Sequence, residues 1–183
     1  VEDALSYLSL IPSKYSTDCS LFGDRVVASK TIVAFLKMEL AKVGTLADQG
    51  QRLADNSARH EWAVFFFFIA ARACFSLGLY QNAVNHLMQG LNITEVYDLK
   101  KAAALLWRWV ARSMAYEGNW EQAIQLLNTQ VDSQSFWSRS EQKLFIAEIY
   151  CLTMELKKAH AIVKEIIYEL PPNIEEIPSK GDF

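Results

Sequence analysis

The stretch YQNAVNHLMQGL, residues 80–91, decides the fold, because its pattern returns twice further along the chain. It places a small residue, Ala83, one turn after an aromatic residue and one turn before a leucine, and Ala71 stands twelve positions earlier. Two antiparallel helices cross closely where each contributes a small residue, so this spacing predicts a helical hairpin. The equivalent pairs are Ala111 with Ala123, in WEQAIQLLNTQ (120–130), and Ala147 with Ala159, in LKKAHAIVKEI (156–166).

Proline marks the limits of a helical body. The four prolines are Pro12, Pro171, Pro172 and Pro178, so none interrupts residues 13–170. Apolar residues in that span recur three and four positions apart and never alternate over the length of a strand. The pattern predicts an all-α protein.

Glycines and polar clusters predict where the helices turn. Gly44, Gly78 and Gly118 each precede a new apolar pattern, and we expect the two helices of a hairpin to be joined there. The polar clusters at 55–58, 92–95 and 132–138 are expected to separate successive hairpins. Their serine, threonine and aspartate side chains are available to cap the helices that follow.

The recurring phrases resemble the second helix of the tetratricopeptide repeat (TPR) family, and Pro171 falls where that family often ends a unit. The resemblance covers residues 58–171. The anchors Ala83, Ala123 and Ala159 lie 40 and 36 residues apart, against about 34 in the family, so we expect longer first helices or linkers. Upstream, Ala47 is a possible anchor, but Phe35 stands where a small residue is expected. The hairpin at 24–56 is therefore only TPR-like.

The resemblance implies an all-α, right-handed solenoid of antiparallel helix hairpins, about four in number, plus a leading half-unit. The half-unit is EDALSYLSLIP (Glu2–Pro12), which resembles a second helix without its partner, so we expect the array to continue before Val1. We expect residues 1–170 to form the repeat domain and residues 171–183 to form an extended tail.

Composition and charge narrow the classes of function. The chain has 183 residues, 51% of them hydrophobic, and a formal net charge of −3. This is the make-up of one folded domain without the basic face that nucleic acid binding requires. No apolar run approaches the roughly 20 residues of a membrane span. The three cysteines show no paired spacing, so we expect a reducing compartment, the cytoplasm, with the nucleus as the alternative.

The sequence carries no motif for catalysis. It has no phosphate-binding loop, no dinucleotide-binding glycine pattern and no nucleophile elbow. His60, His86 and His160 lie on separate predicted helices without a second ligand at metal-binding spacing. We therefore expect no enzyme activity, no metal and no cofactor, with a helical-bundle enzyme as the alternative.

In the TPR family, one stripe of each first helix lines the concave groove that binds partner segments. Carried over to this chain, the stripe gives the following partner-binding residues: Phe65, Phe68, Arg72, Phe75, Leu105, Arg108, Arg112 and Tyr116. The next first helix contributes Glu141, Leu144, Glu148 and Cys151. The resemblance thus implies a groove with phenylalanine and arginine at one end and glutamate at the other.

Two interpretations of this stripe are open. In the first, the chain is a scaffold, adaptor or chaperone that holds a protein or peptide segment with acidic groups, using aromatic anchors and guanidinium groups. In the second, residues 65–68 are all buried by neighbouring helices. The chain would then be an obligate structural subunit of a larger assembly, with its aromatic surfaces permanently covered.

Overall fold

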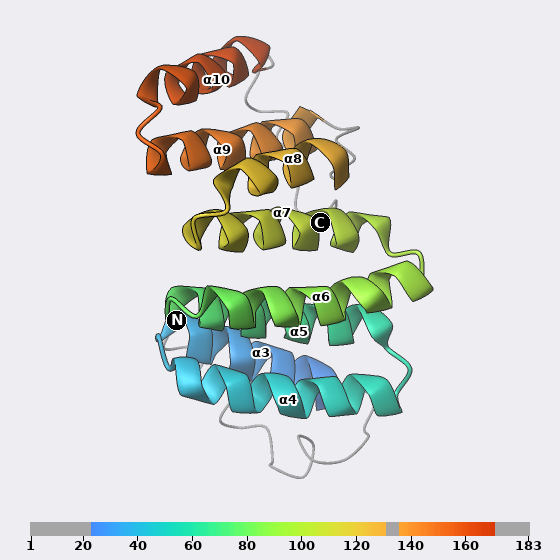
Figure 1. The fold of residues 1–183 in the computed structure, drawn as a ribbon. Coiled ribbons are helices and arrows are strands. Elements are labelled where there is room, and N and C mark those ends of the chain that lie inside the picture. The colour runs from blue at the N-terminus through green and yellow to red at the C-terminus, as the bar shows by residue number, and fades with distance from the viewer. Residues whose placement is uncertain (1–22, 131–135, 171–183) are drawn as a thin grey trace.

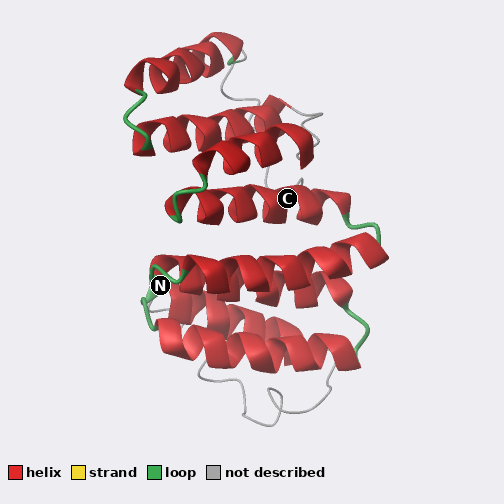
Figure 2. Cartoon of the chain, in the orientation of Figure 1, coloured by secondary structure: helices red, strands yellow, loops and turns green. Residues whose placement is uncertain are grey.

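The computed structural model describes residues 23–130 and 136–170, and within these ranges every regular element is an α-helix (Figures 1 and 2). The elements are α3 (Gly23–Leu36), α4 (Leu40–Asn56), α5 (His60–Ser76), α6 (Tyr80–Val96), α7 (Lys100–Tyr116), α8 (Trp120–Gln130), α9 (Phe136–Leu152) and α10 (Leu156–Glu169). The predicted all-α class is confirmed. The predicted half-unit at 2–12 and the tail at 171–183 lie outside the described residues.

The eight helices of the described ranges form four antiparallel hairpins that stack into a solenoid. The pairs are α3 with α4, α5 with α6, α7 with α8, and α9 with α10, and each helix also packs on the next one in sequence. First helices touch across hairpins, α3 with α5, α5 with α7 and α7 with α9, whereas α4 and α6 do not touch each other. Figure 1 shows α3 and α5 together behind α4 and α6. Hairpins therefore approach most closely on the side of the first helices, which makes that side the inner face.

A three-residue turn repeats at the helix junctions. Its middle residue has a positive φ, as at Gly78 (75°) and Gly118 (96°). The residue after it donates its N–H to the carbonyl five positions back, as from Leu79 to Cys74 at 2.9 Å, which is a Schellman ending. The same turn recurs around Met38, Ala58, Asp98 and Met154.

The turn explains the unusual spacing of the anchors. Helices α4, α5, α6 and α7 each have 17 residues. With a three-residue turn after each helix, one hairpin advances the chain by 40 residues, which is the interval between Ala83 and Ala123. Both helices of the hairpin are long, whereas the sequence suggested only longer first helices or linkers.

The structure corrects three predictions about helix ends. Gly44 lies inside α4, and the turn falls at Met38 instead. The cluster at 55–58 begins too early, since α4 continues to Asn56, and the cluster at 92–95 lies wholly inside α6, which ends at Val96. No side-chain cap forms at α4, α5, α6, α7 or α10. None of the residues at these N-cap positions is a serine, threonine, asparagine or aspartate, whose short side chains cap helices; they are Glu39, Arg59, Leu79, Leu99 and Glu155.

The small residues predicted from sequence occupy the hairpin interiors. All four anchors are at most 5% exposed, and so are the three alanines twelve positions before the later anchors. Close crossings also occur between neighbouring hairpins, where Gly50 of α4 faces the ring of Phe66 and Gly90 of α6 faces Leu106. The register of the hairpins is confirmed by this burial.

Candidate functional site

A line of aromatic rings and guanidinium groups crosses the first helices. We call it the inner belt, and its members are Phe35 of α3, Phe68, Arg72 and Phe75 of α5, Trp109 and Arg112 of α7, and Phe145 of α9. All seven side chains are half-buried. The belt therefore joins all four hairpins on the inner face.

Arg72 stacks against rings from two other hairpins. Its guanidinium carbon lies 4.9 Å from the ring centre of Phe35 and 4.9 Å from that of Trp109, with Phe68 at 6.0 Å. Partial burial lowers the pKa of Arg72, and the positive charge of Arg112 adds to this effect. Its charge is stabilised by ring faces, since a cation is attracted to the negative face of an aromatic ring.

The side chain of Arg112 contacts both aromatic rings and a carboxylate. Its guanidinium carbon lies 4.9 Å from the ring centre of Trp109, 5.1 Å from Phe75 and 5.5 Å from Phe145. Its Nε and Nη2 donate to Oε1 of Glu148 on α9, at 3.0 and 2.8 Å. This ion pair ties two hairpins together.

The hydroxyl of Tyr116 donates to the same Glu148 oxygen at 2.9 Å. Burial raises the pKa of Tyr116 first, and this hydrogen bond raises it further. The ring of Tyr116 also packs edge-on against Phe75, with centres 5.0 Å apart, and beside Tyr80. Glu148 is thus held by an arginine and a tyrosine from α7.

Arg108 lies deeper and is also paired. Its side chain is 8% exposed, and its Nη2 lies 3.0 Å from Oε2 of Glu141 on α9. Burial lowers the pKa of Arg108, while Glu141 acts in the opposite direction. The glutamates of α9 therefore meet the arginines of α7 directly.

The remaining residues of the predicted stripe are less central. Phe65 packs edge-on against Trp62 and Phe66 and borders the core between α3, α4 and α5. Leu105 is half-buried on α7. Phe66, the one fully buried ring of the four phenylalanines at 65–68, has no exposed surface, while the other three are half-buried.

Three belt residues are not in the stripe predicted from the sequence: Phe35, Trp109 and Phe145. A signal was present for two of them, because Trp109 precedes Arg112 by three positions and Phe145 precedes Glu148 by three, and such pairs share a helix face. The sequence did not indicate a place in the belt for Phe35, because it stands where a small residue is expected.

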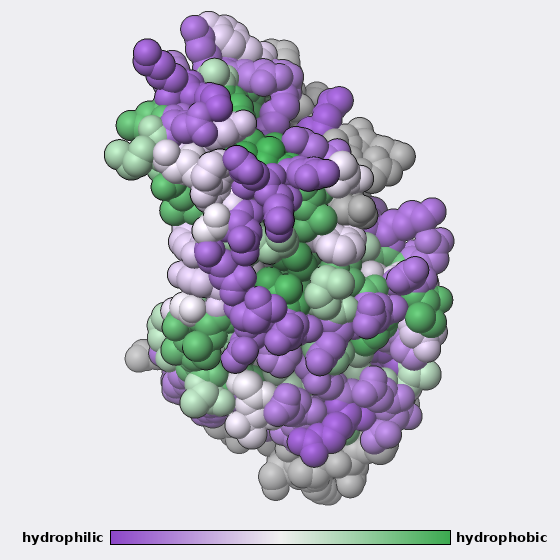
Figure 3. All heavy atoms as spheres, viewed as in Figure 1, coloured by the Kyte–Doolittle hydropathy of each residue, from purple (hydrophilic) through white to green (hydrophobic). Residues whose placement is uncertain are grey.

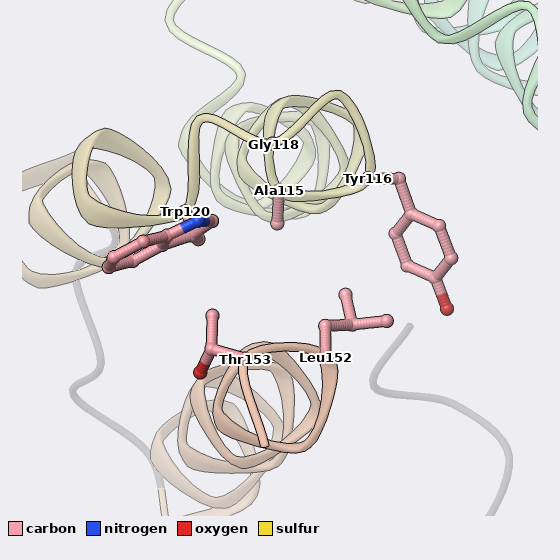
Figure 4. A pocket seen from close by; sticks show the side chains of 6 residues that line it. All are labelled: Ala115, Tyr116, Gly118, Trp120, Leu152 and Thr153. Atoms are coloured by element: carbon pink, nitrogen blue, oxygen red, sulfur yellow. The ribbon is translucent and has the colours of Figure 1, made fainter. Parts of the chain in front are cut away.

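An open pocket of about 420 Å³ lies between the end of α7, the start of α8 and the end of α9. Figure 4 shows Trp120, at the start of α8, across the opening from Leu152 and Thr153 at the end of α9, with Tyr116 at the side.

In the view of Figure 3, hydrophilic side chains cover much of the face formed by α4. The surface of α4 thus differs in chemistry from the inner belt, which consists of aromatic rings and guanidinium groups.

The described residues offer no arrangement for metal chemistry or membrane insertion. No three His, Cys, Asp or Glu side chains in residues 23–130 and 136–170 come together as a metal ion would require. None of the helices in the same ranges is long and apolar enough to cross a membrane. The belt instead offers stacking surfaces and hydrogen-bond donors, which are means of binding.

The fold has known counterparts among solved structures. Two crystal structures of nearly identical TPR-like repeats from a putative kinesin light chain of Podospora anserina, one of them a point variant, superpose with TM-scores of 0.68 and 0.65. Each is 16% identical, and each match covers 91% of this chain and 83% of the other. The sequence itself matches no protein-family model and no curated protein. The chain therefore has the TPR-like helical-repeat fold.

Proposed function

We propose that the chain is a non-enzymatic protein–protein interaction module that binds a segment of a partner protein along its inner face. The observation that carries this proposal is the inner belt, whose seven side chains all stay half-buried. Phe66, on the same helix as three of them, is fully buried. The fold can therefore enclose a ring completely where packing requires it, and the belt keeps surface available for contact.

The fold and the chemistry of the belt support the same function. Solenoids present extended inner surfaces to their ligands. Aromatic and arginine side chains contribute most to binding in protein interfaces, because they bury large areas and donate several hydrogen bonds. The belt combines both residue types across four hairpins.

Selection from a phage library of random peptides tests this function. We expect the wild-type chain to enrich a common peptide pattern. Leu144 lies on the inner stripe of α9 and is 51% exposed, so Leu144→Asp should preserve folding and weaken binding of the selected peptides about tenfold. Met88 of α6 is 39% exposed on a second helix, and Met88→Asp is the matched control.

The outcomes separate the inner face from the rest of the surface. A loss with Leu144→Asp but not with Met88→Asp supports the proposal. Failure to enrich any peptide, or equal binding by both variants, would place the interaction elsewhere or remove it.

One observation favours the alternative of an obligate subunit in a larger assembly. On α6, Leu87 and Leu91 are 1% and 6% exposed because α7 covers them. The equivalent residues of α10, Val163 and Ile167, are 38% and 60% exposed. A further apolar helix packed as α7 packs on α6 would cover them. Light scattering tests this: a monodisperse monomer favours the reversible binder, and aggregation relieved only by co-expression favours the subunit.

A further inference from the structure

We propose that Arg72 is the receptor for one carboxylate of the bound segment, an aspartate or glutamate side chain of the partner protein. This inference rests on the proposed function and names the group that the inner face recognises. It also distinguishes Arg72 from Arg108 and Arg112, which the sequence placed in the same stripe.

The first argument is the distribution of charge on the belt. Arg112 is paired with Glu148 at 2.8 Å, and Arg108 with Glu141 at 3.0 Å. Within residues 23–130 and 136–170, no carboxylate lies within ion-pairing distance of Arg72. Arg72, Arg112 and Glu148 together leave one positive charge without a counterpart.

The second argument concerns hydrogen bonds. A guanidinium group has five N–H donors, and contact with ring faces uses none of them. No hydrogen bond from the Arg72 side chain is made within the part of the chain that the structure describes. The rings of Phe35 and Trp109 hold the group in place. An incoming carboxylate would thus meet a fixed fork of donors, and the entropy lost on binding would be small.

The third argument is electrostatic. Partial burial and the nearby charge of Arg112 both make the charged form of Arg72 less favourable, which lowers its pKa. A bound anion offsets both effects, because it returns hydrogen bonds that water no longer supplies and screens the repulsion between the two guanidinium groups. A single excess positive charge matches a carboxylate, which carries one negative charge, better than a phosphate group, which carries about two.

The alternative receptors are less suitable. The Glu148 oxygen that binds Arg112 also accepts from Tyr116, so a partner carboxylate at Arg112 would have to displace an established network. Arg108 is 8% exposed and lies out of reach of a docked segment unless the chain rearranges. Of the three arginines, only Arg72 is half-buried and has no carboxylate partner among the residues that the structure describes.

A double-mutant cycle tests the inference with peptides from the library selection. We expect the wild type to enrich peptides with an acidic residue at a fixed position. Changing that residue to its amide should weaken binding to the wild type roughly 10–100-fold, the range for hydrogen bonds between charged groups. The same change in the peptide should weaken binding to Arg72→Gln by less than about threefold, because the guanidinium charge that pairs with the carboxylate has been removed. Arg72→Lys keeps the charge without the planar fork and should lie between the two.

Two controls separate a lost charge from a damaged fold. Arg52 is exposed on α4 and has no carboxylate partner among the described residues, so Arg52→Gln should leave affinity unchanged. The amide change in the peptide needs no protein variant, so it remains informative even if Arg72→Gln unfolds.

The outcomes are distinct. Enriched peptides without a fixed acidic position, or an amide effect of the same size on the wild type and on Arg72→Gln, would overturn the role of Arg72 and leave the proposed function standing. Absence of any enriched peptide would refute the proposed function itself, and the role of Arg72 with it.

Discussion

Two glycines on one helix should respond in opposite ways to the same substitution. Gly44 and Gly50 both lie inside α4. A Cβ atom at Gly44 meets nothing within 4 Å. At Gly50 it would lie 2.5 Å from Cδ1 of Phe66 and closer still to Cε1 and Cζ. Gly50 is therefore where α4 and α5 approach closely, and Gly44 is not.

The expected magnitudes follow from this geometry. Alanine in place of glycine inside a helix stabilises it by about 0.5–1 kcal/mol, because glycine loses more backbone entropy on folding. Gly44→Ala should show this gain. At Gly50 the gain is exceeded by the cost of overpacking, roughly 1–3 kcal/mol. Phe66 is 0% exposed, so its ring has no solvent to move into. We expect Gly50→Ala to lose about 1–2 kcal/mol net.

Thermal unfolding followed by circular dichroism measures both effects. For a chain of this size, 1 kcal/mol corresponds to roughly 2–4 °C in Tm. Gly44→Ala should therefore raise Tm by about 1–4 °C, and Gly50→Ala should lower it by about 2–8 °C. Adding Phe66→Leu to Gly50→Ala should destabilise less than the sum of the two single changes, because the smaller side chain makes room for the new methyl group.

Equal stabilisation by both alanines would refute this reasoning. It would mean that the ring of Phe66 does not lie against Gly50, and that the packing of the first two hairpins is different. Strict additivity of Gly50→Ala and Phe66→Leu would lead to the same conclusion.

Three further predictions concern the turns, the anchors and the thiols. Gly118→Ala should destabilise the protein by about 1 kcal/mol in denaturant titrations, because only glycine adopts a positive φ without strain. Met154 has a φ of 60°, so Met154→Gly should stabilise the protein by up to about 1 kcal/mol. A change of the same sign in both variants would contradict the assigned turns. Ala123→Leu should destabilise by roughly 1–3 kcal/mol through overpacking, since Ala123 is 0% exposed, and an unchanged Tm would remove the hairpin register. Burial raises the pKa of Cys74, whereas Cys151 is exposed. Peptide mapping after alkylation near pH 8 should therefore show that Cys151 reacts faster than Cys74. Equal rates would show that the Cys74 thiol is accessible.

Local spacing carried enough information to place the hairpins. The anchor alanines follow from intervals of 12 between helices and of 36–40 between repeats. A close crossing admits only small residues, so the sequence must carry them wherever it occurs. The turns at Gly78 and Gly118 were predictable on a different ground, because glycine tolerates the positive φ of a Schellman ending. The polar cluster at 55–58 placed the turn at Ala58 approximately. The turns at Met38, Asp98 and Met154 were not predicted, since these residues adopt a positive φ only where the packing of the flanking helices offsets its cost.

The candidate site also has features that the sequence predicts and features that only the tertiary structure shows. Helix periodicity placed Phe68, Arg72 and Phe75 on one stripe, because residues three, four and seven apart share a helix face whatever surrounds them. Whether a guanidinium on that stripe meets a carboxylate depends on groups more than 30 residues away, as with Arg112 and Glu148. That meeting is set by the register between hairpins, and a shift of one helical turn, about 5.4 Å, would remove it. The sequence alone thus placed Phe68, Arg72 and Phe75 on one stripe. Only the tertiary structure decided that Arg112 is neutralised, while Arg72 contacts rings and no carboxylate within the described residues.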